Sequence, residues 1–173
     1  MPCSRFIALV TFGFVVLATG PLTAADYVDY QPYRLTTNFR GPSMSLDVVN
    51  GGEFNNMVHL ADTGKYSGQS WHLSPTGDGY YRLSTDFRGR GMCLDVFNGG
   101  AFNNMVHMVT CADFSGQMWR VRQDGDTVRL TTQFRGDQMC LDIFNGGKFN
   151  NYAHLAPCAN YSGQYWRIDP IKN

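Results

Sequence analysis

The chain has 173 residues, and its 14 Lys and Arg residues equal its 14 Asp and Glu residues in number. This length fits one ordinary domain. Aromatic residues make up 14% of the chain and glycine occurs 19 times. Such a composition is typical of a globular protein with short strands and many turns, and argues against a disordered chain. The balanced charge gives no indication of a nucleic-acid partner, and nothing in the composition indicates an oligomeric state.

The first residues differ in kind from the rest. Arg5 precedes an apolar run, Phe6–Gly20, which is followed by Pro21 and by the small residues Ala24 and Ala25. This order predicts that residues 1–25 are a secretory signal peptide, cleaved after Ala24 or Ala25, and that the mature chain is extracellular or periplasmic. The alternative is an uncleaved membrane anchor, because no charged residue interrupts the segment. Pro21 favours cleavage, which leaves residues 26–173 without a predicted membrane span.

An internal repeat organises the remaining residues. Three units, at about 33–80, 81–127 and 128–173, follow one another without a linker, and residues 81–126 and 128–173 are identical at 25 of 46 aligned positions. Every unit contains Phe-Arg-Gly, Leu-Asp-Val or Leu-Asp-Ile, Asn-Gly-Gly, Phe-Asn-Asn, a histidine and finally Ser-Gly-Gln-x-Trp. Repeats of this length indicate that each unit buries its apolar face against its neighbours.

Four short strands are predicted in each unit. In the second unit they are Arg82–Phe87, Met92–Phe97, Val106–Cys111 and Met118–Val121, separated by turn-forming residues such as Asn-Gly-Gly. No segment has helical periodicity. The sequence therefore predicts an all-β protein of twelve strands, closed on itself so that no strand edge is left exposed.

The three Gln-x-Trp motifs at fixed period resemble those of the ricin B-chain lectin family over the whole mature chain. The resemblance implies a β-trefoil, a six-stranded barrel capped by three hairpins. It also implies a carbohydrate partner, bound in shallow pockets with up to one pocket per repeat. The motif residues themselves are expected to be structural, with each Trp in the core and each Gln bracing the backbone: Gln69, Trp71, Gln117, Trp119, Gln164 and Trp166.

The cysteines predict disulfides. Cys3 is removed with the signal peptide, and the remaining four form two pairs, Cys93 with Cys111 and Cys140 with Cys158, each separated by 18 residues. An even number of cysteines in an exported chain favours one disulfide inside each of the second and third repeats. The alternative is free buried thiols.

This pairing predicts a strand register. If Cys93 lies opposite Cys111, then Asp95 lies opposite Val109 and Phe97 lies opposite His107. Side chains alternate along a strand, so these residues share one face while the apolar residues between them face the core. The outer face of each hairpin therefore carries a carboxylate, an imidazole and an aromatic ring.

Such a face suits a sugar. A carboxylate accepts hydrogen bonds from neighbouring hydroxyls, an aromatic ring covers the apolar face of a pyranose, and imidazole or amide groups add further contacts. The resemblance also places a sugar-contacting Asp at these positions. The predicted sugar-binding residues are Asp47, Asp95, Asp142, His59, His107, His154, Phe97, Phe144, Asn104 and Asn151. The first repeat has Val49 in place of the phenylalanine and no cysteine pair, so its site is expected to be the weakest.

Several alternatives stand beside this interpretation. Each Asp is alternatively a cap for the following Asn-Gly-Gly turn, each His a packing residue, and Phe54, Phe102 and Phe149 are expected to pin their loops to the barrel. The aromatic residue that the family usually carries on the third strand is replaced by Ala61, Val109 and Ala156. This loss favours a second hypothesis, a secreted trefoil that binds protein as an inhibitor or adhesion module.

Catalysis is not expected. The chain has no nucleophile motif, no metal-spaced cluster of His and Cys and no phosphate-binding glycine loop. Repeated copies of one Asp do not provide the two unlike carboxylates that glycoside hydrolysis needs. We therefore predict a non-catalytic lectin without a metal or cofactor. Asn160 begins a glycosylation sequon, Asn160-Tyr161-Ser162.

Overall fold

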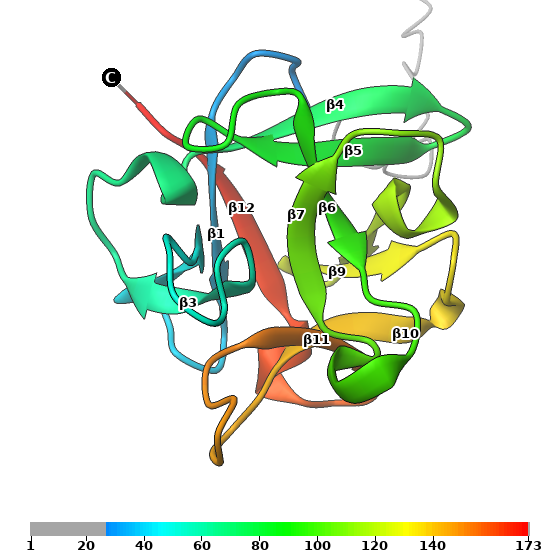
Figure 1. Cartoon of the computed structure of the whole chain (residues 1–173). Coiled ribbons are helices and arrows are strands. Elements are labelled where there is room, and N and C mark those ends of the chain that lie inside the picture. The colour runs from blue at the N-terminus through cyan, green and yellow to red at the C-terminus, as the bar shows by residue number, and fades with distance from the viewer. Residues whose placement is uncertain (1–26, 173) are drawn as a thin grey trace, which may run out of the picture.

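The structure is a computed structural model that describes residues 27–172, so the segment predicted to be a signal peptide lies outside the described residues. Twelve strands occur in the described part and fall into three sets of four (Figure 1). They are β1 (Tyr33–Thr37), β2 (Met44–Val48), β3 (Val58–Asp62), β4 (Trp71–Gly77), β5 (Tyr80–Thr85), β6 (Met92–Val96), β7 (Val106–Thr110), β8 (Trp119–Asp124), β9 (Thr127–Thr132), β10 (Gly136–Ile143), β11 (Ala153–Pro157) and β12 (Trp166–Pro170). The first and last strand of each set form the barrel.

The barrel closes through neighbouring strands in the order β9-β12-β1-β4-β5-β8, with β8 pairing back to β9. The middle strands of each set form the antiparallel hairpins β2–β3, β6–β7 and β10–β11. Four short 3-10 turns complete the described elements: η1 (Ser67–Gln69), η2 (Gly100–Phe102), η3 (Ser115–Gln117) and η4 (Ser162–Gln164). This topology confirms the predicted all-β trefoil. No helix of the described residues is long and apolar enough to cross a membrane.

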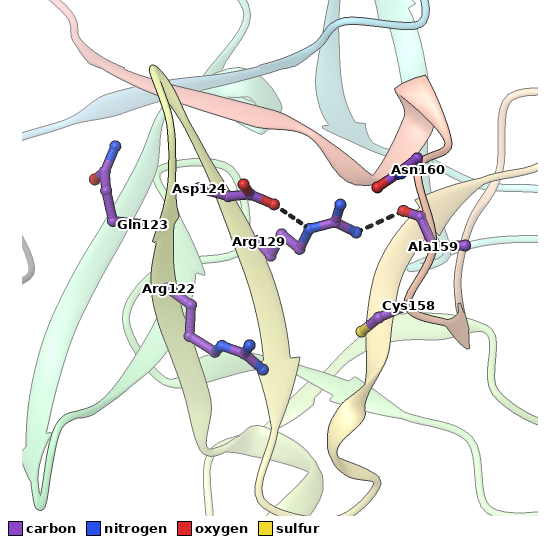
Figure 2. A pocket seen from close by; sticks show the side chains of 7 residues that line it. All are labelled: Arg122, Gln123, Asp124, Arg129, Cys158, Ala159 and Asn160. Carbon is purple, nitrogen blue, oxygen red and sulfur yellow. Dashed lines mark hydrogen bonds and ion pairs between the residues drawn. The ribbon is translucent and has the colours of Figure 1, made fainter.

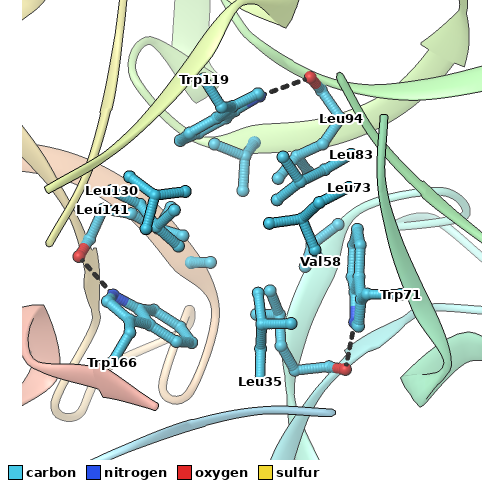
Figure 3. Close-up of a cluster of buried hydrophobic side chains, with 14 of the residues drawn as sticks. Leu35, Val58, Trp71, Leu73, Leu83, Leu94, Trp119, Leu130, Leu141 and Trp166 are labelled. Atoms are coloured by element: carbon cyan, nitrogen blue, oxygen red, sulfur yellow. Dashed lines mark hydrogen bonds between the residues drawn. The ribbon is translucent and has the colours of Figure 1, made fainter. Parts of the chain in front are cut away.

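The three tryptophans surround one shared core. Trp71, Trp119 and Trp166 have no exposed surface, and Figure 3 shows their indoles around a common group of aliphatic side chains. Each indole Nε1 donates a hydrogen bond to a leucine carbonyl of the hairpin in its own repeat, at 2.8 to 2.9 Å. A buried indole needs such an acceptor for its N–H. Complete burial separates these tryptophans from any ligand at the surface.

Two disulfides are present, as the cysteine spacing predicts. Cys93 and Cys111 are joined with a Cα–Cα distance of 4.9 Å, and Cys140 and Cys158 with one of 5.0 Å. In the first repeat the corresponding residues, Ser45 and Thr63, are hydrogen-bonded with their hydroxyl oxygens 2.6 Å apart. Every hairpin is thus joined at the same point, covalently in two repeats.

The predicted register of the hairpin is wrong by two residues. Cys93 lies opposite Val109 rather than Cys111, so that Asp95 lies opposite His107. The ladder sets the pairing, and the disulfide reaches from Cys93 to a residue just beyond β7. A displacement of two residues leaves every side chain on its original face. The outer-face assignment therefore survives, because Leu94, Val96 and their neighbours on β7 are buried while Asp95 and His107 are only partly so.

The Phe-Asn-Asn loops join the repeats to one another. The carbonyls of Asn56, Asn104 and Asn151 accept hydrogen bonds from Met108, Leu155 and Leu60 of a neighbouring repeat, each at 2.8 Å. These asparagines have φ angles of 67 to 71°, a left-handed conformation that Asn tolerates better than most residues. Phe54, Phe102 and Phe149 pack edge-to-face against one another, with centroids 5.8 to 6.2 Å apart. These rings therefore tie the loops to each other.

Candidate functional site

Three shallow hollows occupy equivalent places in the three repeats. Their volumes are about 360, 520 and 470 Å³ for the first, second and third repeat. Each is lined by the repeated Asp, by the first residue of Asn-Gly-Gly, by the loop that ends in Ser-Gly, and by the Phe of Phe-Arg-Gly from another repeat. In the second repeat these residues are Asp95, Asn98, Phe114, Ser115, Gly116 and Phe134.

The Asp side chains are held firmly at one wall of each hollow. Asp95 accepts a hydrogen bond from the backbone N–H of Val96 at 2.7 Å through Oδ1 and one from Gln117 Nε2 at 3.0 Å through Oδ2. Asp47 and Asp142 have the same two contacts. A carboxylate oxygen can accept more than one hydrogen bond, so each Asp retains acceptor capacity toward the hollow.

The glutamine of Gln-x-Trp fixes this arrangement. Gln117 is fully buried, its Nε2 also donates to the Thr110 carbonyl at 3.1 Å, and its Oε1 accepts from the Ala112 N–H at 2.8 Å. Gln69 and Gln164 make the corresponding bonds. A buried amide with satisfied partners has one orientation. The carboxylate that it holds is therefore preorganised before any ligand arrives.

The glycine before each Gln leaves space for the carboxylate. A Cβ atom placed on Gly68, Gly116 or Gly163 would lie 2.0 to 2.2 Å from Oδ1 of the Asp in its own repeat. No side chain fits there while the Asp keeps its conformation. The floor of each hollow is therefore formed by backbone at this glycine.

An exposed aromatic residue stands directly before Ser-Gly-Gln in every repeat. The exposed fractions are 61% for Tyr66, 61% for Phe114 and 62% for Tyr161, and each residue lines the hollow of its own repeat. Sequence reasoning missed these residues, as well as Asn50, Asn98 and Asn145. The sequence does mark the aromatic residues, because one precedes Ser-Gly-Gln in every repeat.

The phenylalanines predicted to form an aromatic platform lie away from the hollows. Phe97 and Phe144 do not line the hollows; their rings stack on His107 and His154, with centroids 3.6 Å apart in both repeats. One face of each phenylalanine is thus covered by an imidazole. Each pair is packed as two stacked rings, and neither Phe97 nor Phe144 lies beside a hollow in which a sugar could stack on it.

The repeated histidines are also outside the hollows. Burial lowers the pKa of His59, His107 and His154 below the usual histidine value, and the nearby Asp of each hairpin only partly opposes this shift. At neutral pH the imidazoles are therefore uncharged. They lie on the Asp face, as the sequence predicts, but they pack against aromatic rings.

Of the two asparagines predicted to contact a sugar, Asn151 has another side-chain partner, because Arg40 Nε donates to its Oδ1 at 2.9 Å. The side-chain oxygen of Asn104 is buried without a hydrogen-bond partner among the described residues, and the backbone carbonyl of Asn104 accepts from Leu155. Neither asparagine lines a hollow of its own repeat. The alternative role of the Asp residues was to cap the Asn-Gly-Gly turn. In the second repeat that cap is Asn103 rather than Asp95, because Asn103 Oδ1 accepts from the Gly99 N–H of the turn at 2.8 Å.

No group of three or more His, Cys, Asp or Glu side chains in residues 27–172 is arranged to hold a metal ion.

Comparison with protein families gives one match, to the ricin-type β-trefoil lectin domain, over residues 33–166. No curated protein sequence matches the chain. Among solved structures, the designed three-fold symmetric protein ThreeFoil is 25% identical with a TM-score of 0.68, over 81% of this chain and 99% of that one.

Natural proteins share the fold at lower identity. The ricin B-like lectin of Macrolepiota procera, solved in complex with lactose, is 19% identical with a TM-score of 0.64, over 83% of this chain and 98% of that one. An exo-β-1,3-galactanase of Clostridium thermocellum is also 19% identical, with a TM-score of 0.66, over 84% of this chain but only 31% of that one. The fold thus occurs both alone and as one part of a larger protein.

Proposed function

Because the chain belongs to the ricin-type β-trefoil lectin family, a carbohydrate-binding family, we propose that it is a secreted, non-catalytic lectin with one shallow sugar site in each repeat. One observation carries this proposal. In all three repeats the same hollow combines a braced carboxylate with an exposed aromatic ring.

These two groups have complementary functions toward a pyranose. The carboxylate of Asp47, Asp95 or Asp142 accepts hydrogen bonds from sugar hydroxyls, and bonds to a charged acceptor are the stronger kind. The ring of Tyr66, Phe114 or Tyr161 packs on the C–H face of the sugar. Asn50, Asn98 and Asn145 also line the hollows, and a side-chain amide offers both a donor and an acceptor.

In this proposal the other residues that were predicted to bind sugar do not contact it. Phe97 and Phe144 pack on His107 and His154, and the backbone carbonyls of Asn104 and Asn151 join the loops of adjacent repeats. His59 takes the same place in the first repeat, beside Tyr152. We assign these residues to the support of the sites.

Export is proposed from the order of residues 1–25 and is consistent with the two disulfides, which form in oxidising compartments. Mass spectrometry of the exported protein is expected to give a new N-terminus at Ala25 or Asp26. A full-length product embedded in the membrane contradicts the signal peptide.

Binding at a single site is expected to be weak. An open hollow with one stacked ring and a few hydrogen bonds corresponds to a Kd of roughly millimolar to tens of micromolar, or about −4 to −6 kcal/mol. Retention on a polysaccharide then depends on engaging several repeats at once. The proposed protein is therefore a multivalent binder of glycans rather than a tight binder of one monosaccharide.

Binding to a glycan array, with competition by free sugar, tests the proposal. The wild type is expected to bind glycans and to be released by the free sugar, whereas the variant carrying Asp95→Ala and Asp142→Ala loses retention while keeping its fold. The second hypothesis, a trefoil that binds protein, is favoured by the small residues Ala61, Val109 and Ala156 on the third strands. Unchanged retention in the variant contradicts the proposed role of the carboxylates, whereas no glycan binding by the wild type supports the second hypothesis instead.

A further inference from the structure

One position in the hollows has a different charge in each repeat. The residue directly before the exposed aromatic is Lys65 in the first repeat, Asp113 in the second and Asn160 in the third, and each lines the hollow of its own repeat. The carboxylate and the aromatic ring are common to all three hollows, so this position is where their electrostatics differ.

The three side chains also differ in their partners. Asp113 forms an ion pair with Arg82, and Asn160 Oδ1 accepts a hydrogen bond from the Tyr165 hydroxyl at 3.0 Å. Lys65 is exposed, and the ion pairs of the described residues do not include it. The positive charge in the first repeat is therefore available to a ligand.

Lys65 also borders a second cleft, of about 440 Å³, beside the hollow of the first repeat. Arg34 and Lys172 line this cleft together with Asp169, which faces Arg34 across the β1–β12 ladder. Arg34 Nη2 donates to the Gly64 carbonyl at 2.8 Å, and no carboxylate of the described chain lies within 4.0 Å of its guanidinium. Two adjacent hollows thus share one lysine and contain two further cations.

The corresponding cleft of the third repeat is neutralised by the protein itself. Figure 2 shows Arg129 between Asp124 and the Ala159 carbonyl; its Nε donates to Asp124 Oδ2 at 2.6 Å. Arg122 in the same cleft lies 4.0 Å from a carboxylate oxygen of Asp137. The cleft of the first repeat is lined instead by Ile171, which lies at the same offset from Trp166 as Asp124 does from Trp119 and cannot pair with an arginine.

We propose that the first repeat binds an acidic saccharide, with a sugar ring between Asp47 and Tyr66 and a carboxylate or sulfate group against Lys65 and Arg34. This inference rests on the proposed lectin function and assigns a ligand class to one of its sites. The hollow of the first repeat and the adjacent cleft are together lined by three cations, Lys65, Arg34 and Lys172. They contain two carboxylates, Asp47 and Asp169. In the second repeat Asp113 adds a further negative charge to that of Asp95 and disfavours the same ligand.

The proposal changes the expected ranking of the repeats. The sequence predicts the first repeat to be weakest because Val49 replaces a phenylalanine, but that phenylalanine stacks on a histidine away from the hollow. Tyr66 supplies the first repeat with its own exposed ring. The repeats are then expected to differ in whether they prefer an acidic or a neutral sugar, rather than in a fixed order of affinity.

The test is an NMR titration of the mature protein that follows the amides beside Asp47, Asp95 and Asp142 separately. The probes are matched pairs: galactose with galacturonate, glucose with glucuronate, and N-acetylglucosamine with its 6-sulfate. The uronates and the sulfate ester separate the two possible sources of the negative charge. The variant is Lys65→Asp, which copies the charge of the second repeat. Lys148→Asp is its control, because Lys148 gives the same change in net charge on the Phe-Asn-Asn loop of the third repeat.

An acidic member of at least one pair is expected to bind the first repeat about three- to tenfold more tightly than its neutral partner, as one or two exposed charge pairs allow. Lys65→Asp and high salt remove this preference, whereas Lys148→Asp keeps it. Equal binding of acidic and neutral sugars at the first repeat, or an equal acidic preference at the second, overturns this inference alone. If no sugar of either kind shifts any of the three sets of amides, the proposed lectin function falls with it.

Discussion

The side-chain amide of Gln117 donates a hydrogen bond to the carboxylate of Asp95 at 3.0 Å. This contact links the motif that identifies the fold to the residue that we propose binds the sugar. Because Gln117 is fully buried and its other polar groups are satisfied by backbone, its position is fixed by the barrel. The fold signature and the site therefore belong to one network, which is repeated three times.

The contact between Gly116 and Asp95 yields a selective way to remove one site. Gly116→Ala places a methyl group 2.1 Å from Asp95 Oδ1, so the carboxylate must turn away from the hollow. We expect sugar binding to be lost at the second repeat only, with a stability cost of about 1–3 kcal/mol for the overpacking. NMR titration read at the amides beside Asp95 and Asp142 measures both sites in one sample.

Gly91→Ala is the matched control for this variant. No atom lies within 4 Å of a Cβ at Gly91, so the same chemical change is expected to leave binding at every repeat unaltered. If Gly116→Ala folds and the second repeat still binds sugar with the affinity of the wild type, the carboxylate is not the group that holds the ligand.

The buried histidines give the stability of the protein a defined pH dependence. Burial lowers the pKa of His59, His107 and His154 in the folded state, so the unfolded chain takes up protons first as the pH falls. The stabilising contribution is complete above the ordinary histidine pKa of about 6.5 and is lost as the pH falls below it. The Tm is expected to decrease between about pH 7 and pH 5.

A variant without two of these imidazoles isolates the effect. His107→Phe with His154→Phe keeps an aromatic ring on Phe97 and Phe144 but has no proton to gain there, and is expected to show a flatter Tm profile over the same pH range. Carboxylates with a lowered pKa, such as Asp29 and Asp86, act only at more acidic pH. An unchanged profile in the double variant shows that these histidines do not determine the pH dependence.

The first hairpin offers a place for a third disulfide. Ser45 and Thr63 occupy the positions of the two cysteine pairs, with their hydroxyl oxygens 2.6 Å apart. Ser45→Cys with Thr63→Cys is expected to form a disulfide that closes a loop of 18 residues. Such a loop contributes about 3 kcal/mol in the chain-entropy model. Thermal unfolding of the oxidised variant and of the oxidised wild type measures the gain, because both proteins keep the two native disulfides, and equal Tm values contradict it.

The fold could be predicted because its determinants are local and repeated. Leu94, Asp95 and Val96 alternate between the core and the surface, and Trp119 recurs at the same offset in each repeat, so pattern alone indicates strands and a three-fold barrel. The register could not be obtained in the same way. A disulfide tolerates a range of Cα positions, and it does not require Cys93 and Cys111 to be directly opposite.

The site could be predicted only in part. Asp95 lines its hollow because it lies on the outer face of a strand, where alternation places it. Phe114 lies in a loop, where no periodicity fixes the direction of a side chain, and only its repetition before Ser-Gly-Gln marks it. Phe97 shares the outer face with Asp95, but alternation does not reveal that His107 covers its ring.

Retention on a glycan by a variant without the exposed rings is the most direct test of the proposed sites. Tyr66→Ala, Phe114→Ala and Tyr161→Ala are combined, and the fold is expected to persist because each side chain is more than half exposed. Tyr30→Ala is the control, because Tyr30 is 73% exposed but does not line a hollow. Each lost ring is expected to weaken its site by about 0.5–1.5 kcal/mol, and the losses combine in multivalent retention. We expect the triple variant to elute without retention and the Tyr30→Ala protein to be retained like the wild type. A folded triple variant that is retained as strongly as the wild type contradicts the proposed sites.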